Sequence, residues 1–128
     1  MDGSAGTTGE IEIEPELAPI GAICAGRVRY MDEGGRRYVF MERLRFLARG
    51  AHKEMDALLC LNYPNGSYPT KLFLPERLSL PSKAGEAALN WNETAYILAR
   101  NWFTWSWTNV PPNQEPFAIL AEHLRAFQ

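Results

Sequence analysis

The stretch of sequence that decides the fold is EMDALLCLNYPNGSYPTKLFLP, residues 54–75. Residues 54–63 are apolar on both faces in their centre, which is typical of a strand in the middle of a sheet and covered on both sides. The PNG at residues 64–66 is a strong turn signal, and the Tyr68–Pro69 pair adds another. Residues 70–75 predict the next strand, which ends at its proline. This stretch therefore predicts two strands joined by a turn.

Two further strands are predicted upstream. Residues 21–31 (GAICAGRVRYM) predict the first, and DEGG at 32–35 predicts a turn because adjacent glycines adopt positive φ at little cost. Residues 36–49 (RRYVFMERLRFLAR) predict the second, although ERLRFLAR contains good helix formers and leaves a helix as the alternative. Their apolar positions fall out of phase midway, and a β-bulge near Glu42 and Arg43 restores the alternation.

The C-terminal part of the chain predicts two helices after a long connection at residues 76–89. Asn92 is a candidate N-cap for a helix over residues 93–103. The last helix, predicted over residues 116–127, has apolar residues at helical spacing on one face. These are Phe117, Leu120, Ala121, Leu124 and Phe127.

The pattern as a whole predicts an α+β fold, an antiparallel meander of about four strands with C-terminal helices. A length of 128 residues with 46% hydrophobic content suits a single core, so residues 17–128 are expected to form one domain. Residues 1–16 predict a flexible N-terminal tail, because they begin small, polar and glycine-rich. Within that tail, EIEIEPE at 10–16 alternates acidic and apolar residues and permits a short edge strand that Pro15 ends.

Composition excludes several function classes. A formal net charge of −2 argues against a broad nucleic-acid-binding surface, which needs clustered Lys and Arg. The apolar runs are too short to span a bilayer, and no apolar segment follows a basic start, so neither membrane association nor a signal peptide is expected. The cytoplasm is the expected compartment.

Few residue types here suit catalysis or metal binding. The two cysteines, Cys24 and Cys60, lie in predicted strands with apolar neighbours and are expected to be packed and unreactive. Their spacing predicts neither a zinc site nor a disulfide framework. His52 is expected in a solvated turn and His123 on the surface of the last helix. No phosphate loop or hydrolase motif is present, so no catalytic residue, metal site or cofactor is assigned.

An aromatic cluster at residues 102–107 is the least ordinary local feature. It consists of Trp102, Phe103, Trp105 and Trp107, with Ser106 between two tryptophans. Such side chains stack on bases, sugars or proline-rich peptides, or close a small core. Trp102 and Trp107 are expected in the core, and Trp105 is the best candidate for exposure. Ser106 has no identified general base, which argues against a nucleophilic role.

Two pieces of the chain resemble the ubiquitin-conjugating enzymes. They read LLCLNYPNGSYPTKLFLP (58–75) and NWFTWSWTNVPPNQEPFAILAEHLRAF (101–127). Tyr68 and Pro69 match the Tyr-Pro of the family's Y-P-x-x-P stretch, and Trp107 matches the tryptophan of its W-x-P. Pro111 or Pro112 replaces a proline that normally comes sooner. The resemblance is closest to divergent bacterial members, whose operons encode ubiquitin-like proteins, activating enzymes and deconjugating peptidases, some of them acting in antiphage defence.

The chain departs from this family at its catalytic elements. The family's cysteine precedes the W-x-P tryptophan, but residues 90–106 contain no cysteine, and the H-P-N motif is missing. An N-terminal helix is not evident in residues 1–20. The resemblance therefore implies a member that carries no cargo and binds a ubiquitin-like protein, or its activating or conjugating enzyme, through Tyr68, Trp105, Ser106 and Trp107. An unorthodox active conjugating enzyme and an aromatic-faced peptide- or carbohydrate-binding module are the alternatives.

Overall fold

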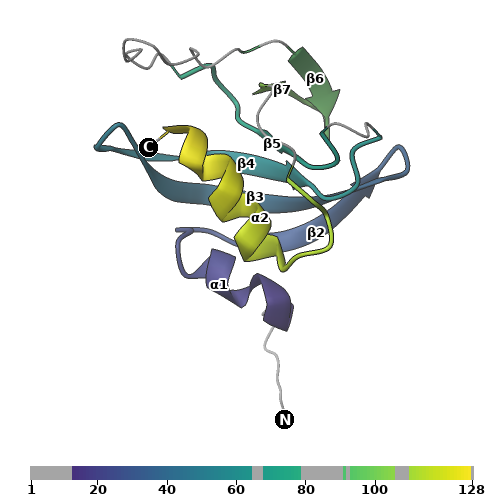
Figure 1. Ribbon diagram of the computed structural model, residues 1–128, viewed down its shortest axis with the longest axis horizontal. Helices are drawn as coiled ribbons and strands as arrows, with labels where there is room; N and C mark the ends of the chain where they lie inside the picture. Colours follow the sequence, from purple (N-terminus) through teal and green to yellow (C-terminus); the bar gives the residue numbers. More distant parts are fainter. Residues whose placement is uncertain (1–12, 65–67, 79–90, 92, 106–109, 128) are drawn as a thin grey trace.

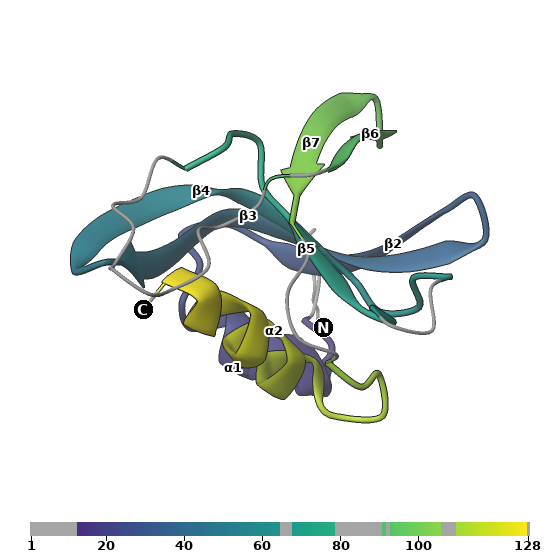
Figure 2. The same ribbon diagram turned by 45° about the horizontal axis from the view of Figure 1, so that its top comes forward.

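The computed structural model describes residues 13–64, 68–78, 91, 93–105 and 110–127. Its centre is a four-stranded antiparallel sheet in the order β2-β3-β4-β5. Two helices, α1 and α2, lie against one face of the sheet, and the hairpin β6–β7 lies against the other (Figures 1 and 2). The predicted α+β class, with a four-stranded antiparallel meander and a C-terminal helix, is confirmed.

The elements follow in chain order. The helical segments are η1 (Pro15–Leu17), α1 (Ala18–Gly21), α2 (Pro116–Leu124) and η2 (Arg125–Phe127). The sheet strands are β2 (Val28–Glu33), β3 (Arg36–Ala48), β4 (Ala51–Cys60) and β5 (Lys71–Phe73), and the hairpin strands are β6 (Glu93–Ile97) and β7 (Arg100–Thr104).

Local sequence accounts for the meander. Gly34 and Gly35 join β2 to β3 with φ of 60° and 78°, the left-handed conformation that two-residue hairpin turns require. β3 is a strand and not a helix, and the predicted bulge is confirmed by a shift in its pairing with β4 between Met41 and Leu44. Arg43, at the bulge, has a φ of 51°, and its N–H donates to Asp56 Oδ1 at 2.9 Å. The bulge keeps Met41 and Leu44 in the same core.

The sheet separates two apolar cores, as expected for a central strand that is buried on both faces. The core under the helices includes Leu17, Ile20, Val39, Met41, Leu44, Leu59, Leu72, Ile119, Leu120 and Phe127. The core under the hairpin consists of Tyr38, Phe40, Leu58, Cys60, Phe73, Ile97 and Trp102. Residues 57–60 of β4 are all buried, because their side chains alternate between these two cores.

The predicted helix over residues 93–103 is wrong, because this segment forms the hairpin β6–β7. Aromatic and β-branched residues favour strands over helices in this segment. Leu98 and Ala99 make the turn with φ of 51° and 61°. Leu74, just after β5, exchanges two backbone hydrogen bonds with Phe103 of β7, which ties the hairpin to the sheet. The predicted cap, Asn92, lies outside the described residues.

The start of the first strand is also corrected. The strand begins at Val28 and not at residue 21. Residues 15–21 form η1 and α1, although no helix is evident in residues 1–20 from the sequence. Prolines open both helical segments, where their missing N–H groups cost nothing. Residues 1–12 of the predicted tail lie outside the described residues, whereas η1 begins at Pro15 and Glu16 accepts a hydrogen bond from the Tyr30 hydroxyl at 2.8 Å.

The buried face of the last helix differs from the predicted one in part. Leu120 and Phe127 are fully buried, as predicted, but Phe117 is 37% exposed. Ile119 and His123 take its place against the sheet, each 2% exposed or less. The stripe that packs therefore passes through residues 116, 119, 120, 123 and 127, which share one face at 3.6 residues per turn.

Candidate functional site

Of the four binding residues predicted from the sequence, the structure describes Tyr68 and Trp105. Tyr68 is half-buried, with its ring beside the ammonium group of Lys71. Trp105 is only 3% exposed, so the prediction that it is the exposed tryptophan is wrong. Ser106 and Trp107 lie outside the described residues. The two described side chains flank two buried polar clusters at the start of β5, one on each face of the strand.

The lysine cluster, formed by Tyr63, Tyr68, Lys71 and Glu93, lies on the hairpin side. The Lys71 side chain is 5% exposed, and its Nζ lies 3.3 Å from Glu93 Oε1. The same Nζ lies 5.1 Å from the ring centroid of Tyr63 and 5.4 Å from that of Tyr68, within cation–π range. The Tyr63 hydroxyl donates a hydrogen bond to the second oxygen of Glu93. A carboxylate and two aromatic rings therefore offset the desolvation of this charge.

The groups of the lysine cluster are already paired with one another. Burial, together with the hydrogen bond to Glu93, raises the pKa of Tyr63 to about 12, so this hydroxyl stays protonated. Glu93 already accepts from both Tyr63 and Lys71. The arrangement fixes charges in place and does not present a general base.

The histidine cluster, formed by Thr70, Val110 and His123, lies on the helix side. The Thr70 hydroxyl donates to the Val110 carbonyl at 2.9 Å and lies 2.9 Å from His123 Nε2. A hydroxyl has one hydrogen, so Nε2 must carry the proton and donate to Thr70. Burial first, and then the charge of Lys71, lowers the pKa of His123 to about 4. The imidazole is therefore neutral at pH 7 and holds α2 against the start of β5.

The burial of His123 corrects its predicted surface position. Glu122 and Arg125 occupy the outer face of α2 and pair with each other at 2.9 Å. His123 lies one turn after Ile119 and three residues after Leu120, both buried, so the helical spacing contains the signal that was missed. The sequence also contains a sign that Lys71 is buried, because it is the one charged residue in the apolar run TKLFL.

The described tryptophans close the cores and do not form an open stacking face. Trp102 is fully buried, as predicted, and its indole N–H donates to the Ile97 carbonyl at 2.9 Å. Trp105 packs edge-on against Trp91 and Phe127, with ring centroids 5.0 and 5.1 Å apart. Neither ring is free for a sugar or a base to stack on.

Neither cysteine offers a reactive thiolate. Cys60 is fully buried in β4, as predicted, and burial raises the pKa of its thiol. Cys24 is half-buried and lies outside the named strands, joined to the sheet by a single bridge to Leu44. Burial raises the pKa of the Cys24 thiol to about 11. Since the thiolate is the nucleophile, both thiols are inert near neutral pH.

On the hairpin side, the outer residues of β3 and β4 are exposed. Alternation along β3 and β4 places Arg45, Leu47, His52 and Glu54 on this face, beyond the hairpin. Leu47 is 45% exposed, and Arg45 pairs with Glu54 at 2.9 Å. A shallow hollow of about 280 Å³ is lined by Arg45, His52, Lys53 and Glu54. His52 is exposed as expected, but it belongs to β4 and not to a turn. We call Arg45, Leu47, His52 and Glu54 the uncovered sheet face.

In the part of the chain that the structure describes, no three His, Cys, Asp or Glu side chains cluster as metal ligands, and no helix is long and apolar enough to cross a membrane. Comparison with known protein families, with characterised proteins and with solved structures found no match to this chain.

Proposed function

We propose that this protein is a non-catalytic, ubiquitin-conjugating-enzyme-like subunit that binds a component of a ubiquitin-like modification pathway. The observation that carries the proposal is the state of its two thiols. A conjugating enzyme holds its cargo as a thioester and needs an accessible thiolate. Here Cys60 is fully buried, and Cys24 is half-buried with a pKa of about 11.

The coarse architecture supports the likeness on which the proposal rests. A four-stranded antiparallel meander is followed by a C-terminal helix, and Tyr68 and Pro69 precede the last strand of the meander. Residues 58–75 and 101–127 are the pieces that resemble the family in sequence, and Trp107 is matched to its W-x-P tryptophan by that resemblance alone. The resemblance is to bacterial members of the family, so the pathway we propose is a bacterial one with its own ubiquitin-like protein. Some operons of such members act in antiphage defence, and that is the role we propose for this pathway.

The uncovered sheet face is the surface that fits protein binding. Its one large apolar side chain, Leu47, is surrounded by polar and charged groups such as Arg45 and Glu54. An apolar centre with a polar rim is the usual anatomy of a protein interface. The two buried clusters beside β5 are already internally paired, so they serve the fold and not a reaction.

The proposal is tested by mixing the protein with a bacterial ubiquitin-like protein, its activating enzyme and ATP. A non-reducing gel is expected to show no dithiothreitol-sensitive adduct, while calorimetry detects binding to the ubiquitin-like protein or to the enzyme. Leu47→Asp should weaken that binding about tenfold or more, as loss of a central apolar contact does. Phe117→Asp, which changes an exposed side chain of α2, is the matched control and should bind normally.

Each opposite result selects an alternative. An adduct that dithiothreitol removes and that Cys24→Ala or Cys60→Ala abolishes would establish an active conjugating enzyme. An adduct that resists dithiothreitol but yields to hydroxide would indicate an oxyester on Ser or Thr. Absence of binding to every pathway component would refute the proposal.

A further inference from the structure

The outer edge of β2 is unpaired in the part of the chain that the structure describes. β2 is the outermost strand of the sheet. Glu33 and Arg36 close its two-residue turn with β3, and the Glu42 amide donates to the Arg27 carbonyl at 2.9 Å. Both contacts direct the backbone N–H and C=O groups of odd-numbered residues toward β3, so alternation directs those of even-numbered residues outward. The outward residues are Val28, Tyr30 and Asp32.

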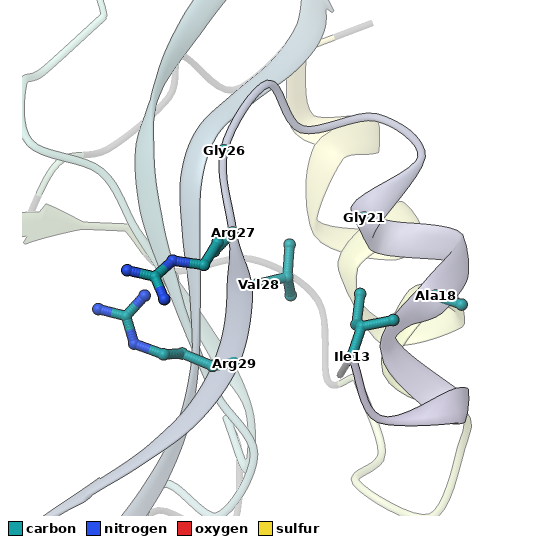
Figure 3. A pocket seen from close by; sticks show the side chains of 7 residues that line it. All are labelled: Ile13, Ala18, Gly21, Gly26, Arg27, Val28 and Arg29. Atoms are coloured by element: carbon teal, nitrogen blue, oxygen red, sulfur yellow. The ribbon is translucent and has the colours of Figure 1, made fainter. Parts of the chain in front are cut away.

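α1 lies beside this edge without covering it. The Val28 side chain points toward α1, so the helix lies over one face of β2 and not along its outer edge (Figure 3). A pocket of about 350 Å³, lined in part by Ala18, Gly21 and Val28, separates the two elements. The described residues therefore leave the outward backbone groups of β2 accessible to a second strand. An open edge of this kind is a template for pairing with another chain.

β2 lacks the usual protection of an edge strand, and its charges are ordered along it. Residues 27–33 read RVRYMDE, with no proline, and the register of β2 with β3 has no bulge. Arg27 and Glu33 are both exposed and share one face of the strand, since successive side chains alternate between faces. The Arg27 guanidinium has no ion pair with any residue that the structure describes. Two copies of this strand that run in opposite directions therefore have complementary charges.

We propose that the protein forms a symmetric homodimer in which β2 pairs antiparallel with β2 of a second copy, on a two-fold axis at Tyr30. The outward groups of Tyr30 then bond to Tyr30 of the partner subunit, and those of Val28 bond to Asp32 of the partner subunit. The same register sets Arg27 opposite Glu33 of the partner subunit, at a Cβ separation of about 5 Å that suits an ion pair. Because of the two-fold axis, this ion pair occurs twice.

Charge selects this register over its neighbours. Outward hydrogen bonds need even-numbered residues opposite even-numbered ones, so the axis lies at a residue and not between two residues. An axis at Arg29 sets this arginine opposite its own copy, and like charges directly opposite each other destabilise a sheet. An axis at Met31 sets Arg29 opposite Glu33 of the partner subunit, but Arg29 is already paired with Glu42 at 3.4 Å. Only the axis at Tyr30 gives Arg27 an acidic partner.

The dimer interface is separate from the uncovered sheet face. Arg45 and Leu47 lie in the part of β3 that extends beyond its pairing with β2, so they stay exposed when β2 is paired. The four strands of each copy join in one sheet of eight. The dimer therefore carries the uncovered sheet face twice, and its existence does not depend on the proposed function.

The test is sedimentation equilibrium of the full chain over a range of concentrations. β2 contributes six residues, whereas a standard interface has about 20–30 residues a side, so the dimer is weak. The mean mass is expected to rise from that of one chain toward that of two chains between about 10 μM and 1 mM. A monomer at every concentration in this range would overturn the proposal.

Charge exchange tests the register. Arg27→Glu and Glu33→Arg should each raise the dissociation constant about tenfold or more, because each sets like charges opposite one another at both ion pairs. An equimolar mixture of the two variants should dimerise as the wild type does, since the mixed dimer restores opposite charges at both positions. Arg77→Glu, an equal change of charge beyond β5, is the matched control and should dimerise normally. Failure of the mixture to dimerise, with both variants folded by circular dichroism, would overturn the proposal.

A proline tests the backbone pairing without changing the ion pair. Asp32→Pro removes the outward N–H of residue 32 and no bond between β2 and β3, and edge strands accept proline at such positions. It should raise the dissociation constant about tenfold or more relative to Asp32→Ala, which keeps that N–H. Equal dimerisation of these two variants would overturn the proposal, because the contact would then lie elsewhere on the molecule.

Discussion

The carboxylate of Glu33 accepts the backbone N–H of Leu98, with its two oxygens 3.2 and 3.1 Å from the nitrogen. Glu33 ends β2, and Leu98 begins the turn of the β6–β7 hairpin, 65 residues later. This contact joins the turn of the hairpin to the edge of the sheet, while the Leu74–Phe103 backbone pair joins its base.

Glu33→Ala is expected to lower the free energy of unfolding by about 1 kcal/mol, because the amide of Leu98 loses a charged acceptor at a partly solvated site. Urea denaturation measures the loss. Glu76→Ala, at another exposed glutamate, is the control and should change stability by less than about 0.5 kcal/mol. An equal effect of the two substitutions would show that the contact of Glu33 with Leu98 does not stabilise the hairpin.

Ala99→Gly is expected to stabilise the protein by about 1 kcal/mol. Ala99 has a φ of 61°, a conformation that costs an L-residue about 1–2 kcal/mol and a glycine almost nothing. Part of this gain is offset by the greater freedom of glycine in the unfolded chain. Ala121→Gly, on the exposed face of α2, should instead destabilise by up to about 1 kcal/mol. Thermal melts of the pair should therefore shift in opposite directions.

The buried His123 makes stability depend on pH. Its folded pKa of about 4 lies below the ordinary value of 6.5, so the unfolded chain binds more protons between these values. The contribution of His123 to the free energy of unfolding is fully present above pH 6.5. It falls by up to about 3 kcal/mol as the pH is lowered toward 4. His123→Gln keeps a donor for Thr70 but cannot titrate, and its stability should fall less over this range. Parallel pH profiles of the two proteins would contradict the buried neutral imidazole.

Lys71→Met is expected to destabilise the protein by about 2 kcal/mol, less than for a fully buried pair, because it leaves Glu93 without its cation but the Glu93 side chain is 37% exposed. The double variant Lys71→Met with Glu93→Gln should recover much of that loss, because a buried ion pair contributes little net stability over a neutral pair. Chemical denaturation of the two single variants and the double variant gives the coupling energy. A coupling near zero would show that the lysine cluster is not a paired unit.

The parts of the fold that the sequence predicts well are those whose local pattern has a single solution. Residues 57–60 predict a strand that is buried on both faces, and in a strand over residues 36–49 the phase change at Glu42–Arg43 predicts a bulge. The β6–β7 hairpin escaped prediction because its turn, Leu98–Ala99, lacks the glycine or asparagine that normally marks positive φ. Its turn is held by Glu33, a contact that no local pattern reveals.

The candidate site also contains residues whose positions the sequence predicts and residues whose positions it does not. The burial of Cys60 is predicted correctly because its neighbours Leu59 and Leu61 are apolar. The burial of Trp102 is also predicted correctly, although its segment is a strand and not the predicted helix. Lys71 meets Glu93 on one face of β5, and Thr70 meets His123 on the other, so both contacts depend on tertiary structure. Trp105 was predicted to be exposed because the sequence does not reveal that Trp91 and Phe127 pack against it.

Thiol reactivity in the native protein tests the central claim most directly, because it needs no partner. Ellman's reagent at neutral pH is expected to leave Cys60 unlabelled, because it is fully buried, and to reach Cys24 only slowly, because this thiol is half-buried and its pKa is raised to about 11. Both should react at once in guanidinium chloride, which is the control for intact cysteines. Rapid labelling of either thiol in the folded protein, located by Cys24→Ala and Cys60→Ala, would contradict a non-catalytic subunit.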